Sequence, residues 1–194
     1  MKNMKKTLCL LLAVLMTVSL LAGCGKKVDD NADSKKVFTV GIDAEYPPFS
    51  YLGDDGSYTG FDIEIAQAAC DQLGWEMKVF PVNWEQKLTQ LDAKECDCIW
   101  SGMTILDSMK EAGYTLSAPY YDNTQVIMVK EGSDIKSSAD LAGKVVAVQL
   151  GTSGDTLLSE DGDLESLTAT FKSLVRSDSF LKCFTELSGG AVDA

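Results

Sequence analysis

The residues with the most useful chemistry stand directly after predicted buried strands. Asp43 supplies a carboxylate that can bind a cation, and Tyr46 and Trp84 supply flat aromatic walls. In open α/β sheets, ligands bind beyond the carboxyl ends of the strands, so side chains in these positions are expected to converge. The residues that we expect at this edge are Asp43, Tyr46, Phe49, Trp84, Ser101, Gly102, Thr104, Gly151, Thr152 and Ser153.

The turn formed by Gly151, Thr152 and Ser153 adds a site for negative charge. It is predicted to present backbone N–H groups at the start of a helix, where free amides and the helix dipole both favour an anion. Together with the carboxylate and the aromatic walls, it suits a small zwitterion. Each feature has a plainer alternative: the aromatic rings could be core, Asp43 and Asp62 could be caps or loop acceptors, and many such turns bind nothing.

Catalytic and metal chemistry have little support. The chain contains no histidine, which removes Ser-His-Asp and Cys-His arrangements, and it has no G-x-S-x-G or P-loop motif. Asp43 and Glu45 are a weak candidate for a carboxylate pair. Four cysteines follow Cys24 without paired metal-ligand spacing: Cys70, Cys96, Cys98 and Cys183. We therefore predict a binding protein with no enzymatic activity, cofactor or metal, whose cysteines are buried thiols or form one disulfide.

The elements that must position these residues alternate between strands and helices. Strands are predicted at 37–42, 76–82 and 96–100, with a loop at 43–60 and helices at 61–73 and 83–94. A second round has strands at 125–129, 144–150 and 170–175, and helices starting near 138, 155 and 178. This order predicts α/β lobes with parallel sheets. We expect lobe one to cover 37–122 and lobe two to cover 123–194, and we expect the second lobe to be incomplete.

The N-terminus reads as an export signal with a lipid attachment site. Three lysines precede an apolar run at 8–20 that is too short to span a bilayer, and Leu21-Ala22-Gly23-Cys24 resembles a bacterial lipobox. We expect a leader at 1–23, lipid on the sulfur of Cys24, a polar tether at 24–36 and anchoring on the outer face of the cytoplasmic membrane. The alternative is an ordinary signal peptide with an incidental cysteine.

The acidic charge narrows the possible partners. The whole chain carries a net charge of −12, and loss of the three leader lysines makes it more negative still. Such a surface repels nucleic acid and anionic headgroups, so we predict no nucleic-acid partner and membrane association through the lipid alone.

Six motifs, in order along residues 37–194, resemble those of the extracellular amino-acid-binding proteins of ABC importers, solute-binding protein family 3. They are VGIDAEYPPFSY, GFDIEIAQAAC, CIWSGMTI, APYYDNTQVIMV, LAGKVVAVQLGTSG and GAVDA. The resemblance implies a bilobed type II periplasmic-binding-protein clamp. It further implies a monomer that closes on a polar amino acid and delivers it to an ABC permease.

The resemblance also implies roles for individual residues. Asp43 and Tyr46 match ligand contacts of lobe one, and Trp84 matches an aromatic wall. Ser101, Gly102 and Thr104 match strand-end residues that meet the ligand amine and carboxylate. Gln149 matches a polar or basic contact, and Gly151 to Ser153 match the carboxylate-binding turn of lobe two.

One position departs from the family pattern. Relatives commonly carry an arginine for the ligand α-carboxylate where this chain has Met109. A thioether cannot replace a bidentate guanidinium. Weaker binding, a different ligand class, or replacement by the adjacent Lys110 would each account for the change.

The final residues, 191–194, resemble the opening of a strand that continues in relatives. We expect the chain to be a fragment or the product of an early stop, with an unpaired strand edge at 191–194. A ligand-sensing receptor domain on the same clamp is the main rival function, although the lipobox makes a transmembrane helix redundant. An enzyme such as a dehydratase or lytic enzyme is a further rival, and it would need a catalytic carboxylate or an added domain.

Overall fold

The computed structural model describes residues 35–194, which form one compact unit. The predicted leader, the lipidation of Cys24 and nearly all of the predicted tether therefore lie outside the described residues. Within the described part, no helix is both long and apolar enough to cross a membrane.

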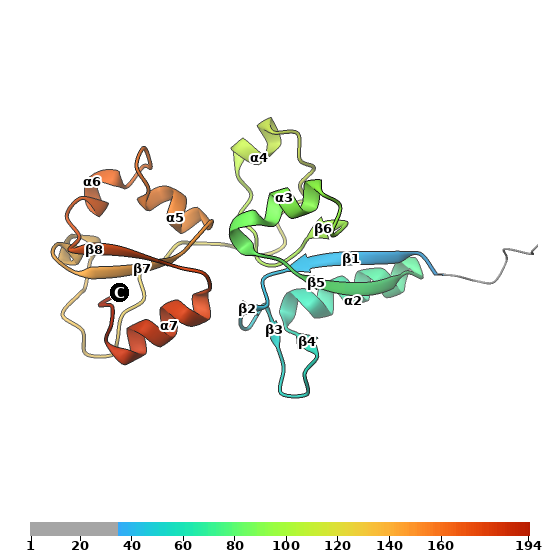
Figure 1. Cartoon of the computed structure of the whole chain (residues 1–194), viewed down its shortest axis with the longest axis horizontal. Coiled ribbons are helices and arrows are strands. Elements are labelled where there is room, and N and C mark those ends of the chain that lie inside the picture. The colour runs from blue at the N-terminus through green and yellow to red at the C-terminus, as the bar shows by residue number, and fades with distance from the viewer. Residues whose placement is uncertain (1–34) are drawn as a thin grey trace, which may run out of the picture. The chain divides into compact units, whose positions relative to one another are not determined.

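Lobe one is built on a parallel sheet in the order β5-β1-β6, with β1 (Val37–Ile42), β5 (Glu76–Pro81) and β6 (Cys98–Ile99). Helix α2 (Phe61–Leu73) packs on it, as Figure 1 shows. The apolar run of β1 predicted its burial, and Val40 and Ile42 are fully buried against Ile63 and Ala66 of α2. Burial of each large aliphatic side chain stabilises the fold by about 1.5–3 kcal/mol.

The helix boundaries in this lobe follow the sequence signals closely. Gly74 ends α2 in the left-handed conformation, so the helix stops at the predicted residue 73. Asn83 accepts a hydrogen bond from the N–H of Gln86 at 3.2 Å and begins the 3-10 turn η1 (Trp84–Gln86). Helix α3 (Lys87–Asp92) follows directly. The predicted helix after Asn83 is therefore present, although its first turn is 3-10 and it ends two residues early.

Three predictions for lobe one were incomplete. The segment 43–60 is not wholly irregular, because β2 (Glu45–Tyr46), β3 (Ser50–Leu52) and β4 (Tyr58–Thr59) form an antiparallel sheet within it. Strand β6 has only two residues instead of the predicted 96–100. Helix α4 (Asp107–Glu111) was not predicted. Such short elements contain too few residues to show a hydrophobic period.

Lobe two centres on β7 (Val145–Gln149) and β8 (Ser173–Ser177), which pair in parallel with Val145 opposite Ser173. The 3-10 turn η2 (Ser138–Leu141) precedes β7, α5 (Ser153–Leu158) and α6 (Glu165–Thr168) connect the strands, and α7 (Phe180–Gly189) follows β8. Figure 1 shows α7 beside this pair. Ile135, Leu141 and Val146 form its buried core.

Two predictions for lobe two were wrong. Residues 125–129 do not form a strand, and Val126 is 78% exposed. An apolar run becomes a strand only where a neighbouring chain segment completes its backbone hydrogen bonds, and none of the described residues does so here. Strand β8 also begins three residues later than predicted.

The expected unpaired edge at 191–194 is also wrong. The N–H of Asp193 donates to the carbonyl of Val145 at 2.8 Å, and the N–H of Ala147 donates to the carbonyl of Ala194 at 2.9 Å. The Asp193 carboxylate accepts the N–H of Val145 at 2.8 Å, and Val192 is buried. This segment therefore lies along the free edge of β7 and covers it. The exact lobe boundary at 122/123 stays a prediction.

Candidate functional site

One cleft is lined by residues of both lobes, and many of them lie just after strands. Nine of the eleven predicted site residues line it, and Phe49 and Gln149 do not. Eight further residues line it that the prediction did not include. The lining residues are Asp43, Tyr46, Trp84, Lys87, Ser101, Gly102, Met103, Thr104, Leu106, Met109, Asn123, Gln125, Gly151, Thr152, Ser153, Thr156 and Phe180.

Asp43 stands at the end of β1 inside a buried polar network. The N–H of Asp43 donates to Ser101 Oγ at 3.0 Å, and Ser50 Oγ donates to the Asp43 carbonyl at 2.6 Å. The carboxylate oxygen Oδ1 accepts the N–H of Glu45 at 2.9 Å. Because Asp43 is only 6% exposed, these bonds hold its carboxylate in one orientation at the cleft wall.

Gln149 lies behind this wall. Its Nε2 donates to Asp43 Oδ2 at 2.7 Å, and its side chain is fully buried. The Gln149 Oε1 atom has no hydrogen-bond partner among the described residues. The side chain of Gln149 therefore joins lobe two to the acid of lobe one and holds Asp43 in place.

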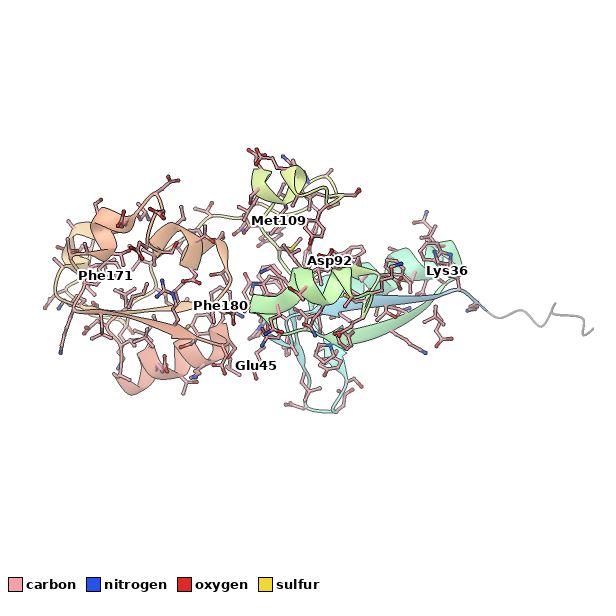
Figure 2. The ribbon with its side chains drawn as sticks, turned by 45° about the horizontal axis from the view of Figure 1, so that its top comes forward. Lys36, Glu45, Asp92, Met109, Phe171 and Phe180 are labelled. Carbon is pink, nitrogen blue, oxygen red and sulfur yellow. The ribbon has the colours of Figure 1, made fainter. Side chains whose placement is uncertain are left out.

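Tyr46 forms one aromatic face of the cleft. Its ring stacks between Phe49 and Phe180, with centroids 5.0 Å from each. Phe49 thus supports Tyr46 from outside the cleft, while Phe180, which the sequence analysis missed, lines it at the start of α7 (Figure 2). Burial, followed by the negative charges of Asp62 and Asp43, raises the pKa of Tyr46, so its hydroxyl stays neutral.

Gly102 is required beneath the Tyr46 ring. Its φ is 58°, and a Cβ atom there would stand 2.7 Å from Cε1 of Tyr46. Both the left-handed backbone and the close approach exclude a larger residue. Steric contact with Tyr46 and the backbone conformation therefore explain why this position is a glycine.

Lys87 is the most informative residue that sequence reasoning missed. It begins α3, three residues after the predicted aromatic wall Trp84, and is 6% exposed. Its Nζ donates to the Trp84 carbonyl at 3.0 Å and to the Gly151 carbonyl at 2.7 Å. Burial lowers the pKa of Lys87, and the charge of Asp43 opposes that shift. The available signal was its place one helical turn after Asn83, the cap that precedes Trp84.

Thr104 meets the turn of lobe two across the cleft. Its Oγ1 lies 3.0 Å from Ser153 Oγ and accepts a hydrogen bond from Asn123 Nδ2 at 2.7 Å. Two hydroxyl groups and one amide therefore meet here, from the segment after β6, from residue 123 and from the start of α5. Such groups can both donate to and accept from a polar ligand.

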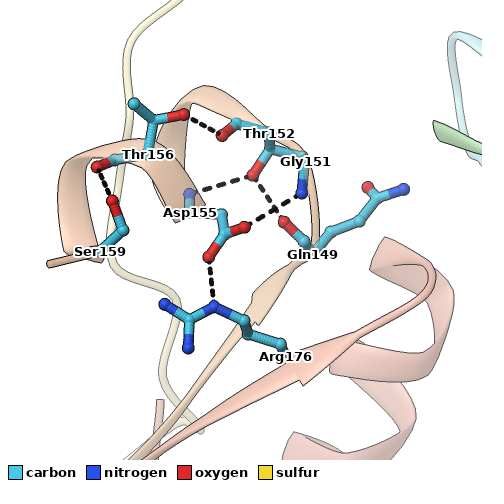
Figure 3. A network of polar contacts seen from close by, with 7 residues as sticks. All are labelled: Gln149, Gly151, Thr152, Asp155, Thr156, Ser159 and Arg176. Carbon is cyan, nitrogen blue, oxygen red and sulfur yellow. Dashed lines mark hydrogen bonds and ion pairs between the residues drawn. The ribbon is translucent and has the colours of Figure 1, made fainter. Parts of the chain in front are cut away.

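The turn after β7 is stabilised by its own acid, as Figure 3 shows. Asp155 accepts the N–H of Gly151 at 3.1 Å through Oδ2 and pairs with Arg176 Nε at 2.6 Å through Oδ1. Thr152 Oγ1 donates to the Gln149 carbonyl at 2.7 Å and accepts the N–H of Asp155 at 3.2 Å. The predicted anion site therefore loses the Gly151 amide, which is already bonded inside the turn.

Met109 lines the cleft from α4 and is 8% exposed; Figure 2 labels it there. The neighbouring Lys110 does not line the cleft. Its Nζ lies 2.8 Å from Asp107, and its side chain is 57% exposed. The geometry contradicts the idea that Lys110 replaces the arginine expected at position 109.

The cysteines that follow Cys24 are free thiols in the described part of the chain: Cys70, Cys96, Cys98 and Cys183. This agrees with the buried-thiol alternative. Burial raises the pKa of Cys98 to about 12, which keeps it protonated and unreactive. Among residues 35–194, no group of three or more potential metal-ligating side chains comes together.

The parallel sheets of two lobes, with a polar and aromatic cleft at their carboxyl ends, define a bilobed binding protein. Residues 38–187 match the bacterial extracellular solute-binding proteins, family 3, and the chain belongs to that family. This confirms the predicted α/β bilobed class. The family and the relatives named below are binding proteins and not enzymes.

Relatives in two bacteria are similar over most of the chain. The L-cystine-binding protein TcyJ of Escherichia coli K12 is 38% identical over 155 residues, which is 76% of this chain and 58% of TcyJ. The arginine-binding extracellular protein ArtP of Bacillus subtilis is 38% identical over 149 residues, which is 77% of this chain and 57% of ArtP. The chain thus spans less than two thirds of the length of these relatives.

Solved structures share the fold. The Gly52Ala mutant of arginine-bound ArgBP from T. maritima is 36% identical, with a TM-score of 0.70 over 81% of this chain and 70% of its own. An ancestral arginine-binding protein bound to arginine is 32% identical, with a TM-score of 0.74 over 82% of this chain and 69% of its own.

Proposed function

We propose that this protein captures an amino acid or a related small zwitterion for an ABC importer. The observation that carries the proposal is a single cleft lined by the buried acid Asp43, the aromatic rings of Tyr46 and Trp84, and the polar turn of lobe two. The relatives are named for binding cystine and arginine, and further ones for histidine, all of which are zwitterionic α-amino acids. A cleft with an acid, aromatic faces and many hydroxyl groups suits that class of molecule.

In this proposal Asp43 attracts the ligand's cationic group, and the rings of Tyr46 and Trp84 bracket its side chain. Phe49 acts by supporting Tyr46, and Gln149 acts by fixing Asp43. Ser101 and Gly102 shape the segment after β6. Thr104 and Ser153 offer hydroxyl groups, and Thr152 lines the cleft while its own hydroxyl holds the turn together. Gly151 contributes its carbonyl contact and its close packing.

The proposal also covers where the protein is held and how its ligand reaches the importer. We propose that lipid on Cys24 holds the protein at the outer face of the cytoplasmic membrane, and that a monomer docks on an ABC permease. The lipobox sequence Leu21-Ala22-Gly23-Cys24 supports the anchor. Mass spectrometry of the protein extracted from membranes tests this, because a lipidated chain begins at Cys24 and carries the added mass of its acyl groups.

Thermal unfolding of the full chain, expressed with its own leader, tests the binding function. Each common amino acid and L-cystine is added at millimolar concentration. A ligand present at about 100 times its Kd stabilises the protein by about 2.7 kcal/mol, which raises Tm by several degrees. A selective rise supports the proposal. A cooperative transition that no amino acid shifts would contradict it.

A further inference from the structure

Lys87 is a buried cation whose contacts do not balance its charge. Its ammonium group touches two carbonyl oxygens, of Trp84 and Gly151, at 3.0 and 2.7 Å. Among residues 35–194, no carboxylate lies within 4.0 Å of it. Removing an ammonium from water is costly unless an anion and hydrogen bonds replace the lost solvation. The position of Lys87 on the cleft wall makes a bound anion the natural partner.

The hydrogen bonds of Lys87 leave room for that anion. An ammonium has three donors, and the two carbonyl oxygens use two of them. The Trp84 ring lies under the group, with its centroid 4.8 Å from Nζ. These contacts fix the nitrogen in place without neutralising it. Because the two carbonyl contacts fix the side chain in one conformation, the third N–H donor is available to a ligand in the cleft.

Asp43 does not take the place of that anion. It influences Lys87 through space, but its two carboxylate oxygens accept hydrogen bonds from Gln149 Nε2 and the Glu45 N–H. The same cleft thus presents one negative group and one positive group at separate points. That arrangement matches the opposite charges of a zwitterion.

Helix α4 lines the same cleft without a cationic side chain, which leaves a need for a cation elsewhere in the cleft. Met109 is buried at the position where the family resemblance implies a carboxylate-binding arginine, and Lys110 is turned away toward Asp107. Lys87 is the cationic side chain among the described residues that line the cleft. The cleft thus has its positive charge at the start of α3, and the residue of α4 that lines it is the uncharged Met109.

We propose that Lys87 Nζ binds the carboxylate of the ligand, in the role that Met109 cannot perform. This inference rests on the proposed amino-acid-binding function. It predicts a ligand class defined by a free carboxylate: the protein should select α-amino acids over the same molecules carrying a carboxamide, because an amide carries no charge for the ammonium to meet.

Calorimetric titration of the full chain with pairs of ligands tests the proposal. The probes are L-arginine, L-histidine, L-glutamine and L-cystine, each compared with its α-carboxamide. The variants are Lys87→Met and the matched control Lys110→Met, which removes an exposed lysine outside the cleft. We expect Lys87→Met to weaken amino-acid binding about 10- to 100-fold and carboxamide binding by less than about threefold, while Lys110→Met changes neither.

The contrary outcomes are distinct. If acid and carboxamide weaken by the same factor in Lys87→Met, the lysine only ties the lobes together through the Gly151 carbonyl, and the proposal fails. No change in either also refutes it. If the wild-type chain binds none of the amino acids, the proposed function itself falls. If Lys87→Met does not unfold cooperatively, Lys87→Gln replaces it in the same comparison. The glutamine keeps a hydrogen-bond donor but removes the charge.

Discussion

The two walls of the cleft hold their polar groups in different ways. In lobe one, Asp43, Ser50 and Ser101 are each at most 6% exposed and are joined by hydrogen bonds. In lobe two, the turn at 151–153 is only half-buried and is held by the pair of Asp155 with Arg176, whose side chains are 13% and 40% exposed.

This difference makes the wall of lobe one more rigid than the wall of lobe two. A buried polar group that loses its partner costs about 1–3 kcal/mol, so the wall of lobe one resists change. A partly exposed ion pair is screened by water and contributes about 1 kcal/mol or less. We therefore expect substitutions in lobe one to affect folding most, and substitutions in lobe two to affect closure and affinity.

The largest effect should come from Gly102→Ala. The added Cβ would stand 2.7 Å from Tyr46, whose ring is stacked between two others, and the left-handed backbone adds about 1–2 kcal/mol of strain. We expect a loss of about 3 kcal/mol in the free energy of unfolding, measured with urea. Gly113→Ala is the control, because its φ is also positive but nothing lies within 4 Å. Equal losses in both variants would remove the steric argument.

Gly151→Ala tests the opposite wall. Its Cβ would stand 2.7 Å from the Cα of Glu85 in lobe one, and opening of the cleft can relieve that contact. We expect a stability loss of about 1–2 kcal/mol, from the backbone alone, together with an affinity loss of about tenfold or more for the amino acid that binds best. Gly143→Ala is the control, because Gly143 is also at positive φ but has no neighbour within 4 Å. It should show a similar loss of stability with unchanged affinity. Unchanged affinity in Gly151→Ala would show that the two walls need not meet.

Met109→Arg should improve binding. A guanidinium on α4 would supply the bidentate carboxylate contact that a thioether lacks, and we expect affinity to rise about tenfold in calorimetry. The variant should leave the carboxamide probes unaffected. If affinity for every amino acid stayed the same, the absence of arginine would have no bearing on binding.

The pH dependence of affinity should report on Lys87. Its pKa is below the ordinary lysine value because of burial, so the ammonium is lost as pH rises through that lowered pKa. Amino-acid affinity should then decline on the alkaline side, at a pH below the range in which exposed lysines lose their protons. Lys87→Met should show a flatter profile over the same range. Parallel profiles for the two proteins would assign the decline to another group.

The smallest effect belongs to Arg176→Gln. Loss of the partly exposed pair with Asp155 should lower stability by about 1 kcal/mol or less, while the Asp155 bond to Gly151 N–H persists. Asp107→Asn, in the highly exposed pair with Lys110, is the control and should have almost no effect. Chemical denaturation measures both. A loss above about 2 kcal/mol in Arg176→Gln would show that the lobe-two wall is as rigid as the other.

Much of the architecture could be predicted because it depends on local patterns. The apolar run at 37–42, the cap at Asn83 and the terminating Gly74 act within a few residues, and the structure places β1, η1 and α2 there. The failed strand at 125–129 shows the limit of this approach. A strand depends on a neighbour that can be distant in sequence, and periodicity carries no information about that neighbour.

By itself, the sequence determined the main strands and helices of both lobes, the residues that follow those strands and the family to which the chain belongs. Only the tertiary structure decided which of those residues meet. It set Gln149 behind Asp43, turned Lys110 outward and brought Lys87 to the carbonyl of Gly151, 64 residues away. Contacts across such separations arise from packing of whole elements, so charge and spacing along the chain cannot reveal them.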